Sequence, residues 1–410
     1  MKNVRETRAA PPPHRLLVLS STYPRWAGDP EPAFVHELAR RLVGRFEVTV
    51  LCPHAAGAKR EEILDGVRVC RYRYAPSRWE RLVNDGGILA NLKAQRWKWL
   101  LLPSFVLGQW LAMLRLRLAW RPEVIHAHWL LPQGILAASA PAVPLVVTSH
   151  GADLFALKGG LFSWLRGKVI KRAAAVTVVS EAMRQRLRAE CPEADARVMP
   201  MGVDLDARFT ADAGEPRSRS TILSVGRLVE KKGLVHLIEA MPMVLAAHPD
   251  ARLAIVGFGP ERGRLEERVS QLQLQDAVHF VGAVPQSELP RHYRSAALFA
   301  APFVEAAGGD QEGLGLVVAE AIGCLCPAVV GDVPAVHDLM GDAPGWVVPQ
   351  RDPAALAKAI ISVLDDPAAA ARQVAGLRER LQQRISWRAV AAGYADLFDG
   401  LVSGAERVDA

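Results

Sequence analysis

Residues 15–43 read RLLVLSSTYPRWAGDPEPAFVHELARRLV and hold a strand pattern, a loop and a helix pattern in that order. The opening stretch is an apolar run that ends before Pro24, which is typical of a strand buried on both faces. Residues 32–43 then place apolar side chains at helical spacing and begin with a proline, which the first turn of a helix tolerates. A buried strand that leads into such a helix predicts the first unit of a parallel α/β sheet.

The same alternation recurs in two series along the chain. Further strand patterns cover residues 46–52, 67–74, 124–129, 145–149 and 175–180 in the first half, and 221–225, 251–256, 278–281, 297–301, 328–330 and 346–348 in the second. Residues 204–220 are polar and aperiodic, and residues 354–401 have the pattern of one or two helices. The predicted fold class is α/β, with two Rossmann-like doubly wound domains that face a central cleft.

The length of 410 residues supports two domains, because a single core rarely grows that large. We expect a disordered tail over residues 1–14, a first domain over 15–205, a linker over 206–220, a second domain over 221–385, and a C-terminal helix over 386–410 that can pack back on the first domain.

Cysteine usage and the absence of long apolar runs indicate the compartment. Five scattered cysteines argue for a reducing environment rather than a disulfide framework. Cys324 and Cys326 lack a second Cys or His pair at ligand spacing, so no metal site is expected. The first residues lack the apolar core of a signal peptide, and the sequence contains no run of about 20 uninterrupted apolar residues that would predict a membrane span. We therefore expect a cytoplasmic protein.

Charge is distributed unevenly between the two halves. Residues 1–205 hold 30 Lys and Arg against 17 Asp and Glu, whereas residues 206–410 hold 20 against 26. The basic half contains no motif that reads nucleic acid, so a charged partner or an anionic membrane surface fits the charge better. Within it, residues 88–121 interleave tryptophans with basic side chains such as Lys93, as an interfacial helix does. Pro103 would break or kink that helix. The alternative is a pair of core helices of the first domain with solvated charges. If the segment binds lipid, the protein rests peripherally on the inner face of the cell membrane.

The strongest chemical motif is EGLGLVVAE, from Glu312 to Glu320. On one helix these glutamates would lie a little over two turns, or about 12 Å, apart and could contact both ends of a ligand. A glycine-rich loop precedes them, so free amides at the helix start would face an anion such as a diphosphate. These amides belong to Gly313, Leu314, Gly315 and Leu316. The alternative is an amphipathic helix with two solvated glutamates.

Two further motifs follow predicted strands. In SVGRLVEKKG, Gly226 permits a turn, and Arg227 and Lys232 offer a planar and a mobile cation to phosphate. The alternative is a solvated basic turn. In TSHGAD, His150 ends a strand where a ligand would lie, although a lone histidine can also be purely structural. Gly151 would let the backbone approach closely.

Found in this order, GRLVEKKG, EGLGL with its second glutamate, HGAD and PMGVD (residues 200–204) resemble the retaining GT-B glycosyltransferases of family 4. The segments STYPRWAGDPEPAFVHELARRL and VIHAHWLLPQG are similar to the exopolysaccharide and lipopolysaccharide branch of that family. The resemblance covers residues 15–395. The chain departs from it at Met201, where an asparagine is commoner, and in its first loop, which lacks paired glycines.

The resemblance implies a role for each motif residue. His150 and Glu312 would contact the transferring sugar, and Arg227, Lys232 and the amides of residues 313–316 would hold the donor diphosphate. Asp153 and Gly226 would support these loops. The nucleotide ribose and base would be bound by Glu320, Gly257, Gly259, Val281 and Gly282, and Gly28 is the glycine available in the first loop.

The resemblance also implies the reaction. A sugar passes with retention from a UDP- or GDP-sugar to a saccharide acceptor, which is carried on a lipid if the membrane prediction holds. The two cations and the helix terminus replace a metal, so neither metal nor cofactor is expected.

Three other functions are open. Residues 257–263 form GxGxxxG after a strand, which is a variant of the turn that binds NAD(P) in dehydrogenases, but no acidic residue stands about 20 positions later at a strand end. A nucleotide-sugar 2-epimerase shares the architecture and needs no acceptor. A non-catalytic sugar- or lipid-binding module is the third, and it would not require Arg227, Lys232, Glu312 and Glu320 together.

Overall fold

The computed structural model describes residues 13–408 except 30–32, 85–86, 89–90, 93–94, 141–142, 156, 158, 212–215, 342 and 344. Most of the predicted tail and Lys93 therefore lie outside the described residues.

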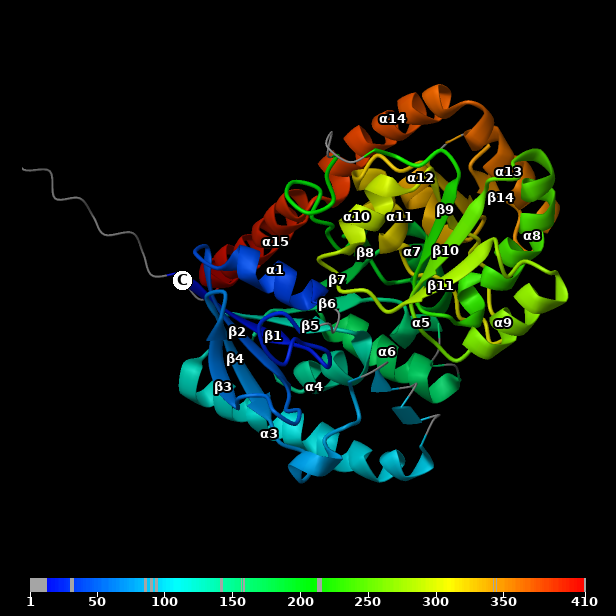
Figure 1. The fold of residues 1–410 in the computed structure, drawn as a ribbon. Coiled ribbons are helices and arrows are strands. Elements are labelled where there is room, and N and C mark those ends of the chain that lie inside the picture. The colour runs from blue at the N-terminus through cyan, green and yellow to red at the C-terminus, as the bar shows by residue number, and fades with distance from the viewer. Residues whose placement is uncertain are drawn as a thin grey trace, which may run out of the picture.

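Two sheets, one in each half of the chain, form the centres of two lobes (Figure 1). The first has the order β3-β4-β2-β1-β5-β6-β7-β8 and is parallel except for the antiparallel pair of β3 and β4. Its strands are β1 (His14–Leu19), β2 (Phe46–Pro53), β3 (Glu61–Leu64), β4 (Val67–Tyr72), β5 (Val124–His128), β6 (Leu145–Ser149), β7 (Ala175–Val178) and β8 (Ala196–Val198).

The second sheet is parallel throughout, with the order β11-β10-β9-β12-β13-β14. Its strands are β9 (Thr221–Val225), β10 (Arg252–Val256), β11 (Val278–Gly282), β12 (Leu298–Ala301), β13 (Ala328–Gly331) and β14 (Val347–Val348). Two doubly wound α/β units confirm the predicted fold class.

Helices cover both faces of each sheet (Figure 1). The first lobe carries α1 (Phe34–Leu42), α3 (Leu102–Trp120), α4 (Ile135–Ala138), α5 (Ala152–Phe155), α6 (Gly160–Arg172) and α7 (Glu181–Glu190). The second carries α8 (Leu234–Ala247), α9 (Arg262–Gln271), α10 (Leu289–Ser295), α11 (Leu316–Gly323), α12 (His337–Met340), α13 (Pro353–Asp365) and α14 (Pro367–Ile385), after which α15 (Trp387–Val408) ends the described chain.

The end of the chain forms three helices rather than the one or two predicted. The Asp352 and Asp366 side chains accept hydrogen bonds from the amides three residues later, at 2.9 Å each, and a proline follows each aspartate. An N-cap before a proline starts a new helix, so Asp366 separates α13 from α14.

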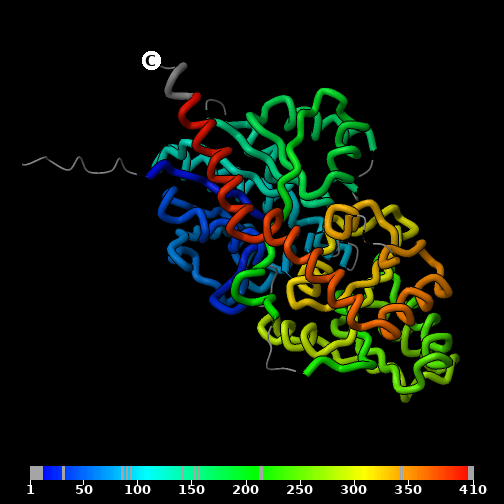
Figure 2. The backbone as a smooth tube through the Cα atoms, turned by 90° about the horizontal axis from the view of Figure 1, so that it is seen from above, coloured from blue at the N-terminus to red at the C-terminus, as the bar shows by residue number. Residues whose placement is uncertain are grey.

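The C-terminal helix crosses to the first lobe. Val203 N donates to Ile385 O at 2.8 Å, so the two chain segments that join the lobes run side by side. Helix α15 then lies on α1 and the first sheet (Figure 2). There Phe398 meets Phe46 edge to face, with ring centroids 5.8 Å apart. Part of the predicted linker is also packed, because Phe209 is buried against Tyr293.

The tryptophan-bearing segment forms the 3-10 helix η2 (Arg96–Leu101) followed by α3. Pro103 lies in the first turn of α3, so it begins the helix rather than kinking it. One face of α3 buries Phe105, Gln109 and Met113 against the first sheet. Among the described residues, one helical stretch, Arg96–Trp120, is long and apolar enough to cross a membrane by length and composition alone, a test that core helices of soluble proteins also pass.

Candidate active site

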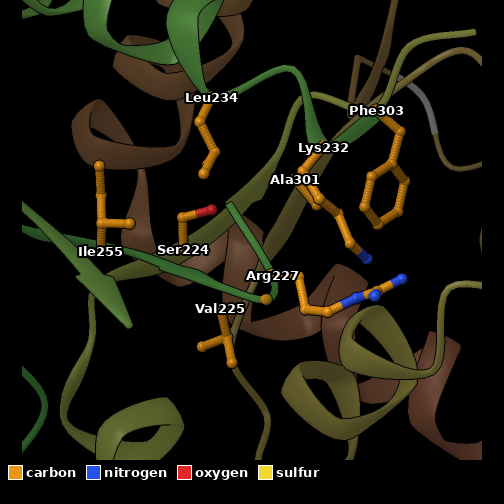
Figure 3. Close-up of a pocket in the computed structure, with 9 residues that line it drawn as sticks. Ser224, Val225, Arg227, Lys232, Leu234, Ile255, Ala301 and Phe303 are labelled. Carbon is orange, nitrogen blue, oxygen red and sulfur yellow. The ribbon is translucent and has the colours of Figure 1, made fainter. Parts of the chain in front are cut away.

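The basic loop after β9 places two cations together. Gly226 turns the chain with φ 151°, and Arg227 and Lys232 line the same small pocket (Figure 3). Within the described chain, the exposed Arg227 guanidinium has no hydrogen-bond or ion-pair partner. Lys232 Nζ lies 4.7 Å from the centre of the Phe303 ring and donates to Glu312 Oε2 at 2.8 Å. The GRLVEKKG and EGLGL motifs therefore meet at this ion pair.

Glu312 lies in the loop before α11, so the prediction that one helix carries both glutamates was wrong. Helix α11 begins only at Leu316, because its N-cap Gly315 adopts a left-handed φ of 78° that ends any helical path from Glu312. Burial acts to raise the pKa of Glu312, but the charges of Lys232 and Lys231 lower it to about 2. Glu312 is thus a carboxylate in an ion pair at neutral pH.

The start of α11 presents amides beside this ion pair. The first N–H groups of a helix have no partner within the helix, so they are free to bind an anion. Because α11 begins at Leu316, these amides belong to Leu316 and Val317. Of the predicted amides of residues 313–316, the first three lie in the preceding loop, and the Gly313 amide is hydrogen-bonded to the Glu312 carboxylate. A diphosphate placed here would meet two cations and a helix N-terminus.

Glu320 lies within α11 and faces the space between the lobes. Tyr293 Oη donates to Glu320 Oε2 at 3.0 Å. The cavity of about 110 Å³ beside Glu320 is lined from both lobes, for example by Phe34 of the first and Leu316 of the second. Burial raises the pKa of Glu320 to about 7, although the Tyr293 hydrogen bond and the charges of Arg208 and Lys232 oppose the shift. Its charge therefore changes near neutral pH.

His150 lies across from this helix start. A Cβ atom added to Gly313 would come within 3.2 Å of the His150 carbonyl oxygen, so the two lobes touch at this point. The His150 ring packs against Phe34 and Trp129, with centroids 4.9 and 5.0 Å away. Burial lowers the pKa of His150 to about 3, so its ring is neutral at physiological pH.

Asp153 supports the loop that carries His150. Its Oδ2 accepts from the Leu130 amide at 2.6 Å and its Oδ1 from Ser149 Oγ at 2.8 Å. These bonds tie the end of β6 to the segment after β5.

The predicted base-pocket residues form a backbone layer behind the basic loop. Gly257 N donates to Gly282 O at 2.8 Å, and Val281 is largely exposed. A Cβ on Gly257 would lie 1.9 Å from the Gly226 carbonyl oxygen, and one on Gly259 would lie 2.4 Å from that of Leu228. Close packing on the Arg227 loop thus explains these glycines, and a dinucleotide is not needed to account for GxGxxxG.

One predicted residue lies apart from the site, and two residues that contact the site were not predicted. Gly28 occupies a turn next to the Arg25–Asp29 ion pair, and no described contact brings it to the cluster. Tyr293 and His128 contact site residues but were not singled out from sequence. For His128 a signal existed, since HAH in a buried strand places two histidines on one face.

The chain has two doubly wound lobes, and the cleft between them holds a cationic loop, a helix N-terminus and two glutamates. This arrangement defines the class of GT-B glycosyltransferases, which use nucleotide-sugar donors. The family model described as Glycosyltransferase Family 4 matches residues 33–207, and that described as Glycosyl transferases group 1 matches residues 207–384. The chain belongs to the family 4 glycosyltransferases.

Similar proteins agree with this assignment. A GDP-mannose-dependent alpha-(1-6)-phosphatidylinositol monomannoside mannosyltransferase of Mycolicibacterium smegmatis is 34% identical over 65% of this chain and 73% of its own. A glycogen synthase of Mycobacterium tuberculosis is 29% identical over 94% of each chain. Among solved structures, the sucrose-phosphate synthase of Thermosynechococcus elongatus has a TM-score of 0.77 at 22% identity, covering 95% of this chain and 100% of its own, which shows the fold. The dehydrogenase and epimerase alternatives find no support in these comparisons.

Proposed function

We propose that this glycosyltransferase moves a hexosyl group from a nucleoside diphosphate sugar to a lipid-linked saccharide, with retention of anomeric configuration, in cell-surface polysaccharide or glycolipid synthesis. The observation that carries the proposal is the Lys232–Glu312 ion pair beside Arg227, with His150 facing it. The mannosyltransferase similar to this chain is named for a phosphatidylinositol-based acceptor, which supports an acceptor on a lipid.

The donor would bind through its diphosphate. Lys232 carries three donor hydrogens, so it can keep Glu312 and still bind a phosphate oxygen, while Arg227 is free to bind another. Glu312 would then accept hydrogen bonds from sugar hydroxyls. Together these charges would stabilise the departing diphosphate, and we propose that the enzyme needs no metal for that step.

Retention would follow from attack on the face that the nucleotide leaves. The bond from the acceptor oxygen to the anomeric carbon forms as the bond to the phosphate oxygen breaks, and that phosphate oxygen takes the acceptor proton. A double displacement would need a free carboxylate as nucleophile. Glu312 is instead held by Lys232, and its pKa of about 2 makes it a weak base.

We propose that the outer face of α3 and η2 rests on the cytoplasmic leaflet. Residues 95–121 contain five basic and no acidic side chains. Large apolar side chains along this face are exposed, among them Trp99 (58%), Leu100 (81%) and Leu118 (79%). An apolar face edged by cations is complementary to an anionic bilayer surface.

A thermal-shift panel on the full chain tests the proposal, since a ligand that binds only the folded state raises Tm by mass action. We expect one nucleoside diphosphate and its hexose conjugate to raise Tm, and transfer to a lipid-linked saccharide to survive EDTA. The product anomer, read by NMR, should match the donor. No stabilisation by any nucleoside diphosphate sugar would contradict the proposal.

A further inference from the structure

Three histidines form a buried chain that ends at the cleft. His126 and His128 project from the same face of β5, with ring centroids 4.2 Å apart, and both are buried. His128 Nδ1 lies 2.9 Å from His150 Nε2, and these two rings are stacked at 16° with centroids 5.1 Å apart. His150 is the member that the proposed function places at the transferring sugar.

Neighbouring residues hold this chain in place. His126 Nε2 lies 2.7 Å from Thr148 Oγ1, which is also 3.1 Å from Tyr394 Oη on α15. The His128 ring is thus packed between two other imidazoles, one of which is tied to the C-terminal helix. Rotation of His128 away from His150 would disrupt this packing.

The contact between two neutral imidazoles requires complementary tautomers. Burial lowers the pKa of all three histidines, so none is charged at neutral pH. One nitrogen of the His128–His150 pair must therefore carry the hydrogen and the other must accept it. The two choices give His150 opposite roles at its remaining nitrogen, Nδ1.

The far side of His128 distinguishes the choices. His128 Nε2 is buried and has no hydrogen-bond partner among the described residues. If His128 Nδ1 accepted, Nε2 would carry a buried N–H with no acceptor; if Nδ1 donates, Nε2 keeps only a lone pair. Buried donors without acceptors are rarer in folded proteins than acceptors with unused lone pairs. Donation from His128 is therefore favoured.

We propose that His128 is a positioning residue that donates from Nδ1 to His150 Nε2 and so fixes His150 as the Nδ1–H tautomer. The His150 ring packs against Phe34, which lines the cavity between the lobes, so the ring lies beside the cleft. His150 is then a neutral hydrogen-bond donor to a sugar or phosphate oxygen. It has no free lone pair with which to take the acceptor proton. This inference rests on the proposed role of His150 at the sugar.

Nitrogen-15 NMR of the histidine side chains in the ligand-free full chain tests the tautomer without any assay of activity. We expect His150, assigned by loss of its signals in His150→Gln, to show a protonated Nδ1 and an unprotonated Nε2 between about pH 5.5 and 8. A protonated Nε2 would overturn the inference and leave the glycosyltransferase function intact. Full activity of His150→Gln would instead contradict the proposed role of His150 and leave the tautomer standing.

Substitutions at His128 supply the functional readout. Asparagine can place an N–H near the position of Nδ1, whereas leucine fills the space without a donor. We expect His128→Leu to lower kcat by about 10- to 100-fold with little change in KM, and His128→Asn to restore most of it. A merely structural role predicts equal losses in kcat for both variants, in proportion to their losses in Tm. That pattern would also overturn the inference.

Discussion

Lys232 Nζ donates to Glu312 Oε2 at 2.8 Å and thereby joins the loop after β9 to the loop before α11. Both side chains are mostly buried, with 14% and 17% of their surface exposed. The two loops come from different parts of the second lobe, so the ion pair organises the site before any donor arrives. Binding of a diphosphate then requires a shift of one flexible ammonium group rather than assembly of the site.

Lys232→Met is expected to lower kcat/KM by roughly 10²- to 10³-fold, because it removes a cation from the leaving diphosphate. It should also reduce stability, since Glu312 is left buried without its ion-pair partner. The double variant Lys232→Met with Glu312→Gln should recover stability but not activity. The matched control is Lys231→Met, whose ammonium pairs with Asp310, and we expect it to lose less than about tenfold. Equal losses at the two lysines would contradict the assignment.

Glu320 should make stability depend on pH. Its pKa is raised from 4.5 to about 7, so the folded state binds this proton more tightly than the unfolded state. The stabilising effect is full below about pH 4.5 and is lost as pH rises through 7. Glu320→Gln is therefore expected to match the wild type near pH 5 and to be more stable near pH 8, by on the order of 2 kcal/mol. Urea unfolding at the two pH values measures this, and parallel curves for both proteins would exclude it.

The affinity for the sugar donor should change over the same pH range in which Glu320 titrates. A carboxylate accepts hydrogen bonds from ribose hydroxyls more strongly than a protonated acid does. Affinity for the donor sugar nucleotide is expected to rise between pH 6 and 8 in the wild type and to stay flat in Glu320→Gln. Calorimetric titration with the nucleotide sugar found by thermal shift checks this. A pH dependence that persists in the glutamine variant would assign it to another group.

The two chain segments that connect the lobes pack so closely that a larger side chain between them should destabilise the protein. A Cβ on Gly202 would lie 2.4 Å from the Trp387 ring, where the two connecting segments meet. We expect Gly202→Ala to destabilise the protein by about 1–3 kcal/mol through overpacking. Gly376→Ala on α14 is the control, because nothing lies within 4 Å of that position and alanine favours helix. A neutral Gly202→Ala would show that the crossing is loosely packed.

Membrane association should depend on the exposed face of α3 and η2. Leu100→Ser with Leu118→Ser is expected to reduce co-sedimentation with anionic vesicles several-fold without lowering Tm, since both side chains are largely exposed. Met243→Ser, at an exposed position of α8 in the other lobe, should have no effect. Binding should also weaken with added salt. Equal binding of all three proteins would exclude this face as the docking surface.

The continuous apolar strands were predictable, whereas edges and loops were not. The bounds of β6 and β9 match the prediction because each is a short buried run between turn signals. The edge strand β3 was missed because its sequence, EEIL, is half exposed and polar, and β8 was missed because it has only three residues. Local pattern carries little information about such elements.

Within the site, residue types were predictable and contacts were not. The spacing of Glu312 and Glu320 favoured one helix, but left-handed Gly315 ended it. The Lys232–Glu312 and His128–His150 contacts depend on how distant loops and strands pair. Sequence motifs alone do not specify that pairing.

Binding of the donor diphosphate by the loop after β9 is tested most directly by comparing the affinities for a nucleoside monophosphate and diphosphate. Calorimetry measures both in the wild type and in Arg227→Gln. Arg227 is exposed and has no partner among the described residues, so its loss should leave Tm unchanged. We predict that the wild type binds the diphosphate at least about tenfold more tightly than the monophosphate and that Arg227→Gln loses most of this difference. Equal affinities for both nucleotides in the wild type, or an undiminished preference in the variant, would contradict the claim that this loop binds the donor diphosphate.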